Sequence, residues 1–525
     1  MSVHPGSSDV RDETSALEVA SEGDREKGTL GPRASSEAKG TRQLSLGAEE
    51  ATLRVFAGRL WPLLSFVMVY AAANTTKGLL FFFFLRSTIV CGEETPADFD
   101  RSSSDWSGSR YCNDRCRVAR DATLIKGIAN GIEHFGQLFC LPAAGVIADS
   151  LGRNFPFTVS FAGFSASMLA LAVAALVSRG PSVVPLAMVS SLLRGFTDSF
   201  HVMRQVSVTD MFSSAKGRGY VYGNIIVFRI ICSGIVAFIL TATVIAENTY
   251  DYAAPFFSFS AILLVMAAVF PCAMRETNTN PTRDLDCKRM SPFHALLVFR
   301  EDTVVLYIGI LAFCVVAAAS VMTIAGGYVI GAYGYTQVEA VYILFAAGFL
   351  VFLAACSAPL VIRAVGNRRT LRVAIASALI GLCILCFSPI SRFFFFLGVA
   401  FIALAIMGIP AYMALLSKNI AMSKMGKTVA AVGTLTIIAT AIFTPVYAAI
   451  FHAVGAGGEC SDDTNLQLAW IPWGVATVFM AIGYLTMHVW FREFPEEVVS
   501  SSVPAPAAAV QMQDMKAAAD DGASS

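Results

Sequence analysis

Long apolar runs separated by short polar interruptions repeat along most of the chain, from about residue 58 to residue 491. A helix needs about 20 largely apolar residues to cross the hydrocarbon core of a bilayer. The pattern predicts twelve such helices, at 58–85, 122–148, 155–178, 182–208, 220–246, 253–274, 302–328, 337–362, 370–390, 393–417, 428–453 and 467–491. We therefore expect an all-α membrane protein with twelve transmembrane helices.

Polar stretches divide this array and bound it. The long polar stretch at 275–301 separates the sixth helix from the seventh, which predicts a six-helix bundle at 55–274, a cytoplasmic central loop and a second six-helix bundle at 302–491. Residues 1–50 and 495–525 are polar and poor in aromatic residues, so we expect disordered tails. The first of these tails lacks the apolar core of a secretory signal peptide.

Composition agrees with a chain that is solvated by lipid. Hydrophobic residues make up 55% of the sequence and charged residues only 14%, whereas soluble domains carry about 25% charged residues. The formal net charge is zero, and nothing suggests a nucleic-acid partner.

Basic residues in the short loops predict the orientation, because cytoplasmic loops of membrane proteins are enriched in Lys and Arg. They gather in the loops on the side of both termini, while the opposite loops after the first contain only Arg179 and Arg392. We expect both termini in the cytoplasm, and the protein in the plasma membrane or in a secretory or endolysosomal membrane.

Four of the twelve cysteines fall in predicted outer loops: Cys91, Cys112, Cys116 and Cys460. On an oxidising side of the membrane they would form up to two disulfides, and the alternative is free thiols that face the interior of an organelle. No Cys or His pair completes a zinc ligand set with Cys112 and Cys116, so no metal is expected.

Two loops, one in each predicted half, have similar sequences. The segment GVIADSLGRN (145–154) after the second helix aligns without gaps with PLVIRAVGNRR (359–369) after the eighth, which places Gly152 opposite Gly366 and Asp149 opposite Arg363. The next loops, FSSAKGRGYVYG (212–223) and MSKMGKTVAAVG (422–433), are also alike. Two six-helix halves with matching loops indicate a duplicated fold, as in large classes of transporters.

The first loop resembles the motif Gly-x-x-x-Asp-(Arg/Lys)-x-Gly-Arg-(Arg/Lys) that joins helices 2 and 3 in the major facilitator superfamily. It keeps the Gly, Asp, Gly and Arg of that motif and departs at Ser150 and Asn154. The resemblance implies two pseudo-symmetric halves that rock about a central site. The gating residues that it implies at the cytoplasmic rim are Gly145, Asp149, Gly152 and Arg153, with Arg363, Gly366 and Arg368 in the second copy.

Each residue of this loop then has an expected role. Asp149 and Arg153 would hold the two halves together on the cytoplasmic side, through contacts that break when the halves rock. Gly145 would let helices pack closely, and Gly152 would supply a tight turn. The alternative is that Asp149 and Arg153 only anchor helix ends in the headgroup region.

Ionisable residues within membrane helices are costly and mark aqueous cavities or buried partners. They lie in the first half, where Arg194, Asp198, His201 and Gln205 are spaced to share one face of a continuous fourth helix. The second half is nearly free of such charge, which suggests that it offers an apolar or aromatic wall. The candidates for contact with solute or proton are Asn74, Lys77, Glu133, Arg194, Asp198, His201, Arg229 and Tyr412.

Several roles for these residues remain open. Arg194 and Arg229 with the acids could be buried ion pairs that hold the first half together. Glu133 or Asp198 could instead carry a coupling proton, since burial and a nearby cation shift a carboxylate in opposite directions, and His201 could relay it. The excess of cations favours an organic anion or a zwitterion over an uncharged solute.

We therefore predict a monomeric secondary transporter that moves a small organic solute by alternating access, coupled to protons and without a cofactor. The alternative is a transporter-like sensor or scaffold without net transport. A membrane enzyme has less support, because the helices contain no His-x-x-x-His pair or carboxylate cluster, and no phosphate-binding loop indicates an ATP-driven pump.

Overall fold

The computed structural model describes residues 61–88, 115–177, 183–211, 215–245, 252–277, 290–419, 422–454 and 468–493. The tails predicted at 1–50 and 495–525 lie outside these residues, as do Cys91, Cys112, Cys460 and the side chain of Cys116. Across the described residues every regular element is a helix, which confirms the expected all-α class.

The elements of the predicted first half lie over the expected spans, although α3 begins well before residue 122 and the span 182–208 is divided between two helices. They are α2 (Trp61–Thr88), α3 (Arg115–Leu151), α4 (Asn154–Val177), α5 (Val183–Gly195), α6 (Phe200–Met211), α7 (Ala215–Leu240), the π-helical η3 (Thr241–Ile245) and α8 (Ala253–Ala273).

Two short helices, α9 (Pro292–Leu296) and α10 (Val298–Glu301), occupy the end of the predicted central loop. The elements of the second half follow them: α11 (Thr303–Ala319), η5 (Ser320–Ile324), α12 (Ala325–Tyr333), α13 (Gln337–Val365), α14 (Asn367–Leu385), α15 (Arg392–Leu404), η6 (Ala405–Met407), α16 (Gly408–Asn419), α17 (Met422–Val454) and α19 (Ile471–Glu493).

Nine helical spans in the described part of the chain are long and apolar enough to cross a membrane. Three predicted spans are not among them: α3, the pair α5 and α6, and α14. Helix α3 carries the polar stripe of Lys126 and Glu133, and α14 begins with the arginine-rich turn Asn-Arg-Arg-Thr-Leu-Arg. The pair α5 and α6 is divided into two short pieces.

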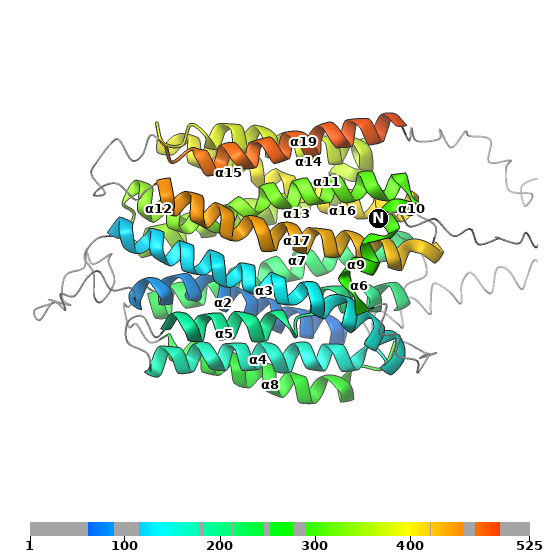
Figure 1. Ribbon diagram of the computed structural model, residues 1–525, viewed down its shortest axis with the longest axis horizontal. Coiled ribbons are helices and arrows are strands. Elements are labelled where there is room, and N and C mark those ends of the chain that lie inside the picture. Colours follow the sequence, from blue (N-terminus) through cyan, green and yellow to red (C-terminus); the bar gives the residue numbers. More distant parts are fainter. Residues whose placement is uncertain are drawn as a thin grey trace, which may run out of the picture. The chain divides into compact units, whose positions relative to one another are not determined.

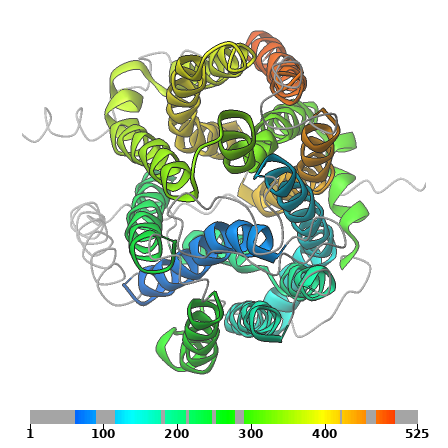
Figure 2. The same ribbon diagram turned by 90° about the vertical axis from the view of Figure 1, so that its left-hand side faces the viewer.

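The described residues all belong to one compact unit. Within it, α4 packs along α8, and α11 along α19. Helix α3 also packs along α17, and α7 packs against α13 and α16, so that helices of the two predicted halves lie side by side (Figure 1). Figure 2 shows most of these helices nearly end-on.

The fourth membrane span is broken, so the expectation of one continuous helix over 182–208 is wrong. Helix α5 ends at Gly195 and α6 begins at Phe200. The backbone N–H of Asp198 donates to the carbonyl of Arg194, and that of Ser199 donates to Oγ of Ser160 at 3.1 Å. A non-helical backbone is tolerated at membrane depth where protein groups satisfy it.

Glycines make this break possible because two backbones approach closely beside it. A Cβ added to Gly136 in α3 would meet the backbone of Gly195, and one added to Gly195 would meet the carbonyl of Glu133. The seventh and tenth spans are also interrupted, by the 3₁₀ segments η5 and η6. Mid-helix 3₁₀ segments often mark hinges.

Candidate solute and coupling site

An ion pair joins α2 to α3 in the first half. The Nζ of Lys77 donates to Oε2 of Glu133 at 2.7 Å, and the two side chains are only 4% and 8% exposed. Two charges withdrawn from water in this way are stable only while both are present, because a lone buried charge has no compensating partner.

Arg194 at the end of α5 connects this pair to a second acid. Its Nε lies 3.1 Å from Oε1 of Glu133 and 3.7 Å from Oδ2 of Asp198, and its Nη2 donates to Oδ1 of Asn74 at 2.5 Å. The guanidinium carbon also lies 4.1 Å from the centroid of the Phe164 ring. One cation is therefore shared between two carboxylates, and an apolar ring covers it.

Asp198 occupies the break between α5 and α6. The hydroxyl of Tyr70 donates to its Oδ1 at 2.5 Å, and Nε2 of Gln137 donates to its Oδ2 at 3.0 Å. Gln137 is in turn paired with His134 at 2.8 Å. Asp198 is held by groups from α2, α3 and α5, so a change in its charge would be felt by all three helices.

His201 and Arg229 stand beside this cluster. The His201 ring packs edge-on against Tyr70, with centroids 5.8 Å apart. Arg229 on α7 lies close enough to Tyr70, Arg194 and Asp198 for their charges to interact. No hydrogen bond or ion pair joins the Arg229 side chain to a residue that the structure describes.

The break in the fourth span changes how its candidates are arranged. Arg194 and Asp198 are brought together by the turn between α5 and α6, whereas His201 and Gln205 follow on a separate helix. The expected single face of Arg194, Asp198, His201 and Gln205 therefore does not exist.

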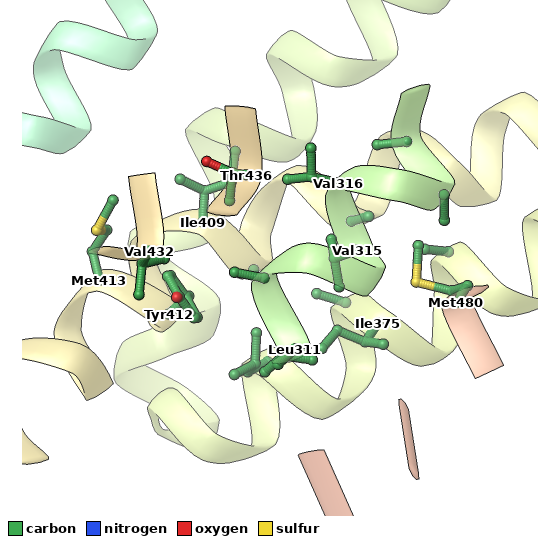
Figure 3. A pocket seen from close by; sticks show the side chains of 18 of the residues that line it. Leu311, Val315, Val316, Ile375, Ile409, Tyr412, Met413, Val432, Thr436 and Met480 are labelled. Carbon is green, nitrogen blue, oxygen red and sulfur yellow. The ribbon is translucent and has the colours of Figure 1, made fainter. Parts of the chain in front are cut away.

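An apolar cavity of about 350 Å³ opens among helices α11, α14, α16 and α17 of the second half (Figure 3). Its lining includes Leu311, Val315, Ile375 and Met480, and its few polar side chains are Gln205 from α6, Tyr412 and Thr436. Thr436 donates to the carbonyl of Gly433 in its own helix. The buried hydroxyl of Tyr412 has no hydrogen-bond partner among the described residues.

The loop after α3 contains a second, separate network. Arg153 lies 2.6 Å from Oδ1 of Asp149 through Nη1 and 3.0 Å from Oδ2 of Asp210 through Nε. Burial lowers the pKa of the Arg153 guanidinium, but the hydrogen bond to Asp149 and the charge of Asp210 outweigh it, and the net pKa is raised. Asp149 and Asp210, the two acids that pair with Arg153 here, both belong to the first half.

Glu276, just after α8, completes this network. Its carboxylate accepts the backbone N–H groups of Arg153 at 2.8 Å and Asn154 at 3.1 Å, at the N-terminus of α4. A carboxylate is favoured there by the helix dipole. Asp210 and Glu276 were not among the sequence candidates; the signal that could have found them is an acid at the end of each of the fourth and sixth spans.

The two copies of the loop share one backbone feature. Gly152 has a φ of +101° and Gly366 a φ of +84°, a region that favours glycine. Nothing lies within 4 Å of a Cβ added to Gly145. The close helix packing that was expected at this glycine is therefore not found in this structure. In the second copy Arg368 lies over the Phe491 ring at 5.0 Å, and the side chain of Arg363 is outside the described residues.

The two halves meet closely at the predicted outer end. Nε2 of His452 on α17 lies 3.0 Å from Oδ1 of Asp121 on α3. A Cβ added to Gly127 would meet Ala448, and one added to Gly327 of α12 would meet Thr123. Glycine and alanine let these helices approach.

In the described part of the chain, no group of three or more His, Cys, Asp or Glu side chains is arranged to hold a metal ion.

Comparison with known proteins shows which family and fold the chain is similar to. Residues 126–444 match the model of the Major Facilitator Superfamily. No curated protein sequence matches the chain. Three solved structures have similar folds. Their sequence identities to this chain are so low that the similarity supports the fold alone.

The human organic anion transporter MFSD10 has a TM-score of 0.60 at 14% identity and covers 82% of this chain and 99% of its own. The xylose transporter XylE from E. coli has a TM-score of 0.56 at 12% identity, covering 81% and 97%. The nucleoside transporter NupG has a TM-score of 0.55 at 11% identity, covering 84% and 100%.

Proposed function

The chain belongs to the major facilitator superfamily, a family of membrane transporters, and we propose that it moves a small organic solute by alternating access, driven by protons. It is an integral multi-pass membrane protein. Family members are transporters rather than enzymes, and the finer assignment rests on the charges of this chain.

The observation that carries the proposal is the sharing of Arg194 between Glu133 and Asp198. A proton bound by either carboxylate would weaken its attraction for Arg194 and shift the guanidinium toward the other acid. Because these groups lie on α3 and the broken fourth span, and Lys77 of α2 pairs with Glu133, such a shift would change how those helices pack. Proton binding would thereby be linked to the rocking of the halves.

The Arg229 guanidinium favours an anionic or zwitterionic solute over an uncharged one. Arg229 makes no ion pair among the described residues, and a charge within a membrane helix is costly when no ion-pair partner compensates it. An acidic group of the solute would supply that partner. The similar structures include transporters of organic anions, sugars and nucleosides, so the fold by itself does not choose among these classes.

The close contacts at the predicted outer end support a state that is closed on that side. We place both termini and the Arg153 network in the cytoplasm, following the distribution of basic residues in the loops. Proton flow along the gradient would then drive the change to the opposite state.

Uptake into proteoliposomes with and without a pH gradient tests the proposal, using a panel of organic acids, zwitterions and neutral solutes. We expect gradient-driven accumulation of an acid or zwitterion by the natural protein. Asp198→Asn and Glu133→Gln should reduce that accumulation at least tenfold while leaving counterflow of labelled solute measurable.

Gly348→Leu, at an open and exposed position of α13, provides the control and should accumulate normally. Proton-driven accumulation that survives both amide variants would contradict the role of the carboxylates. An absence of transport across the whole panel would favour a sensor or scaffold.

A further inference from the structure

The apolar cavity of the second half lies next to the charged cluster of the first. Gln205, which lines the cavity, is on α6 one turn after His201. Helix α7, which carries Arg229, packs against α16, which carries Tyr412. No charged side chain of the described residues lines the cavity, so a molecule in it would be surrounded mainly by hydrocarbon, with Gln205 contributed by α6 and with α7 packed against α16.

The chemistry of the cavity is unusual for a site that binds sugars or other polyols. Side chains such as Val316, Ile409 and Val432 dominate its lining, and Thr436 already donates within its own helix. A polyol placed there would lose hydrogen bonds to water without replacement, which costs free energy. The cavity volume of about 350 Å³ lies within the usual range of small-molecule sites.

We propose that this cavity holds the apolar part of the solute, which is therefore an amphipathic organic anion with its acidic group on the Arg229 side. This inference rests on the proposed function and names the substrate class of the same site. Tyr412 lines the cavity, and its buried hydroxyl, which has no hydrogen-bond partner among the described residues, can bind a carbonyl, ether or hydroxyl oxygen of the solute.

A series of straight-chain carboxylates, from acetate through butanoate and hexanoate to octanoate, tests this inference. Binding to the full chain in nanodiscs is measured by calorimetry, and the dissociation constant is plotted against chain length. Each methylene that enters the cavity should tighten binding about fourfold. Matched primary alcohols, which lack the charge, should bind at least tenfold more weakly.

Gly433→Leu provides the matched test of location. Gly433 lines the cavity and has open space where a Cβ would be, so leucine fills the cavity from α17. Gly348→Leu is the control, because Gly348 also has open space but is on α13 and does not line the cavity. Thr436→Leu, one turn along α17 from Gly433, serves if Gly433→Leu fails to fold.

We expect the fourfold dependence in the natural protein and in Gly348→Leu, and a flat dependence in Gly433→Leu. Partition of the ligands into nanodisc lipid is the same for all variants, so the difference in slope reports the cavity. An unchanged slope in the filled variants would overturn the inference, and so would alcohols that bind as tightly as carboxylates. Binding is measured without a gradient, so failure of proton-driven accumulation would count only against the proposed transport.

Discussion

Lys77, Glu133 and Arg194 depend on one another because each is buried where water cannot replace a lost partner. Removing one member of a buried pair typically costs about 3–5 kcal/mol, whereas removing both partners costs much less. Comparing the cost of removing one partner with the cost of removing both therefore shows whether the charges form an ion pair that holds helices together or act only on a solute.

Lys77→Met should therefore lower the unfolding free energy by about 3–5 kcal/mol. Adding Glu133→Gln to that variant should restore much of the loss, because the carboxylate left without its ammonium is then neutral. Thermal unfolding of the purified protein in one detergent gives both values. Lys126→Met is the control, since its ammonium donates to the carbonyl of Gly78 at 3.2 Å and the loss should be smaller.

If the double variant were as unstable as the sum of the two single variants, the residues would act independently. The contact between Lys77 and Glu133 would then contribute little to stability.

At the scale of elements, the break between α5 and α6 is held by the contact of two backbones at Gly136 and Gly195. Gly195→Ala places a methyl group against the carbonyl of Glu133, and relieving that clash would displace Arg194 and Asp198 together. We expect a loss of about 1–3 kcal/mol in unfolding free energy, with a loss of transport. Gly234→Ala in α7, where a Cβ has open space, should be neutral or slightly stabilising. A Gly195→Ala protein with normal stability and normal transport would show that this contact is not required.

The Arg153 network gives a second prediction at this scale, concerning rates. Asp149 is 65% exposed, so its pair with Arg153 should contribute about 0–1 kcal/mol, whereas Asp210 is only 25% exposed. Asp210→Asn should therefore change the exchange rate between the two states more than Asp149→Asn does, and both should leave solute affinity within about twofold. Single-molecule fluorescence and equilibrium binding measure the two quantities. Abolished binding with unchanged exchange in Asp149→Asn would place this loop in the solute site.

The sequence predicts the membrane spans well because lipid imposes length and hydropathy on each one. It also places Lys77, Glu133, Arg194 and Asp198 in the first half and leaves the second half nearly uncharged. The pairing among those residues depends on side-chain geometry across helices, which spacing within one helix does not contain. The break at 196–199 is hidden because hydropathy averages over it, although Thr197, Asp198 and Ser199 are residues that favour turns.

The cavity near Tyr412 could not be predicted for a different reason. Its volume is what remains after α11, α14, α16 and α17 have packed, and its lining residues are ordinary apolar side chains in every one of those helices. Close packing normally removes such spaces. A cavity is therefore a property of the assembled bundle rather than of any segment.

At the scale of the whole molecule, we expect the two halves to separate at the predicted outer end during each transport cycle. In the structure described here, α3 meets α12 and α17 there through small residues and the Asp121–His452 contact. A covalent link across that contact would hold the protein in one state and prevent the cycle.

A disulfide between positions 119 and 331 would prevent that separation. A Cβ on Gly331 lies 3.7 Å from the Cβ of Ala119, within the range of disulfide geometry. Oxidised Ala119→Cys/Gly331→Cys protein should lose at least nine-tenths of its transport and recover it after reduction, while each single variant is insensitive to oxidant. Undiminished transport by fully cross-linked protein would contradict alternating access at this interface.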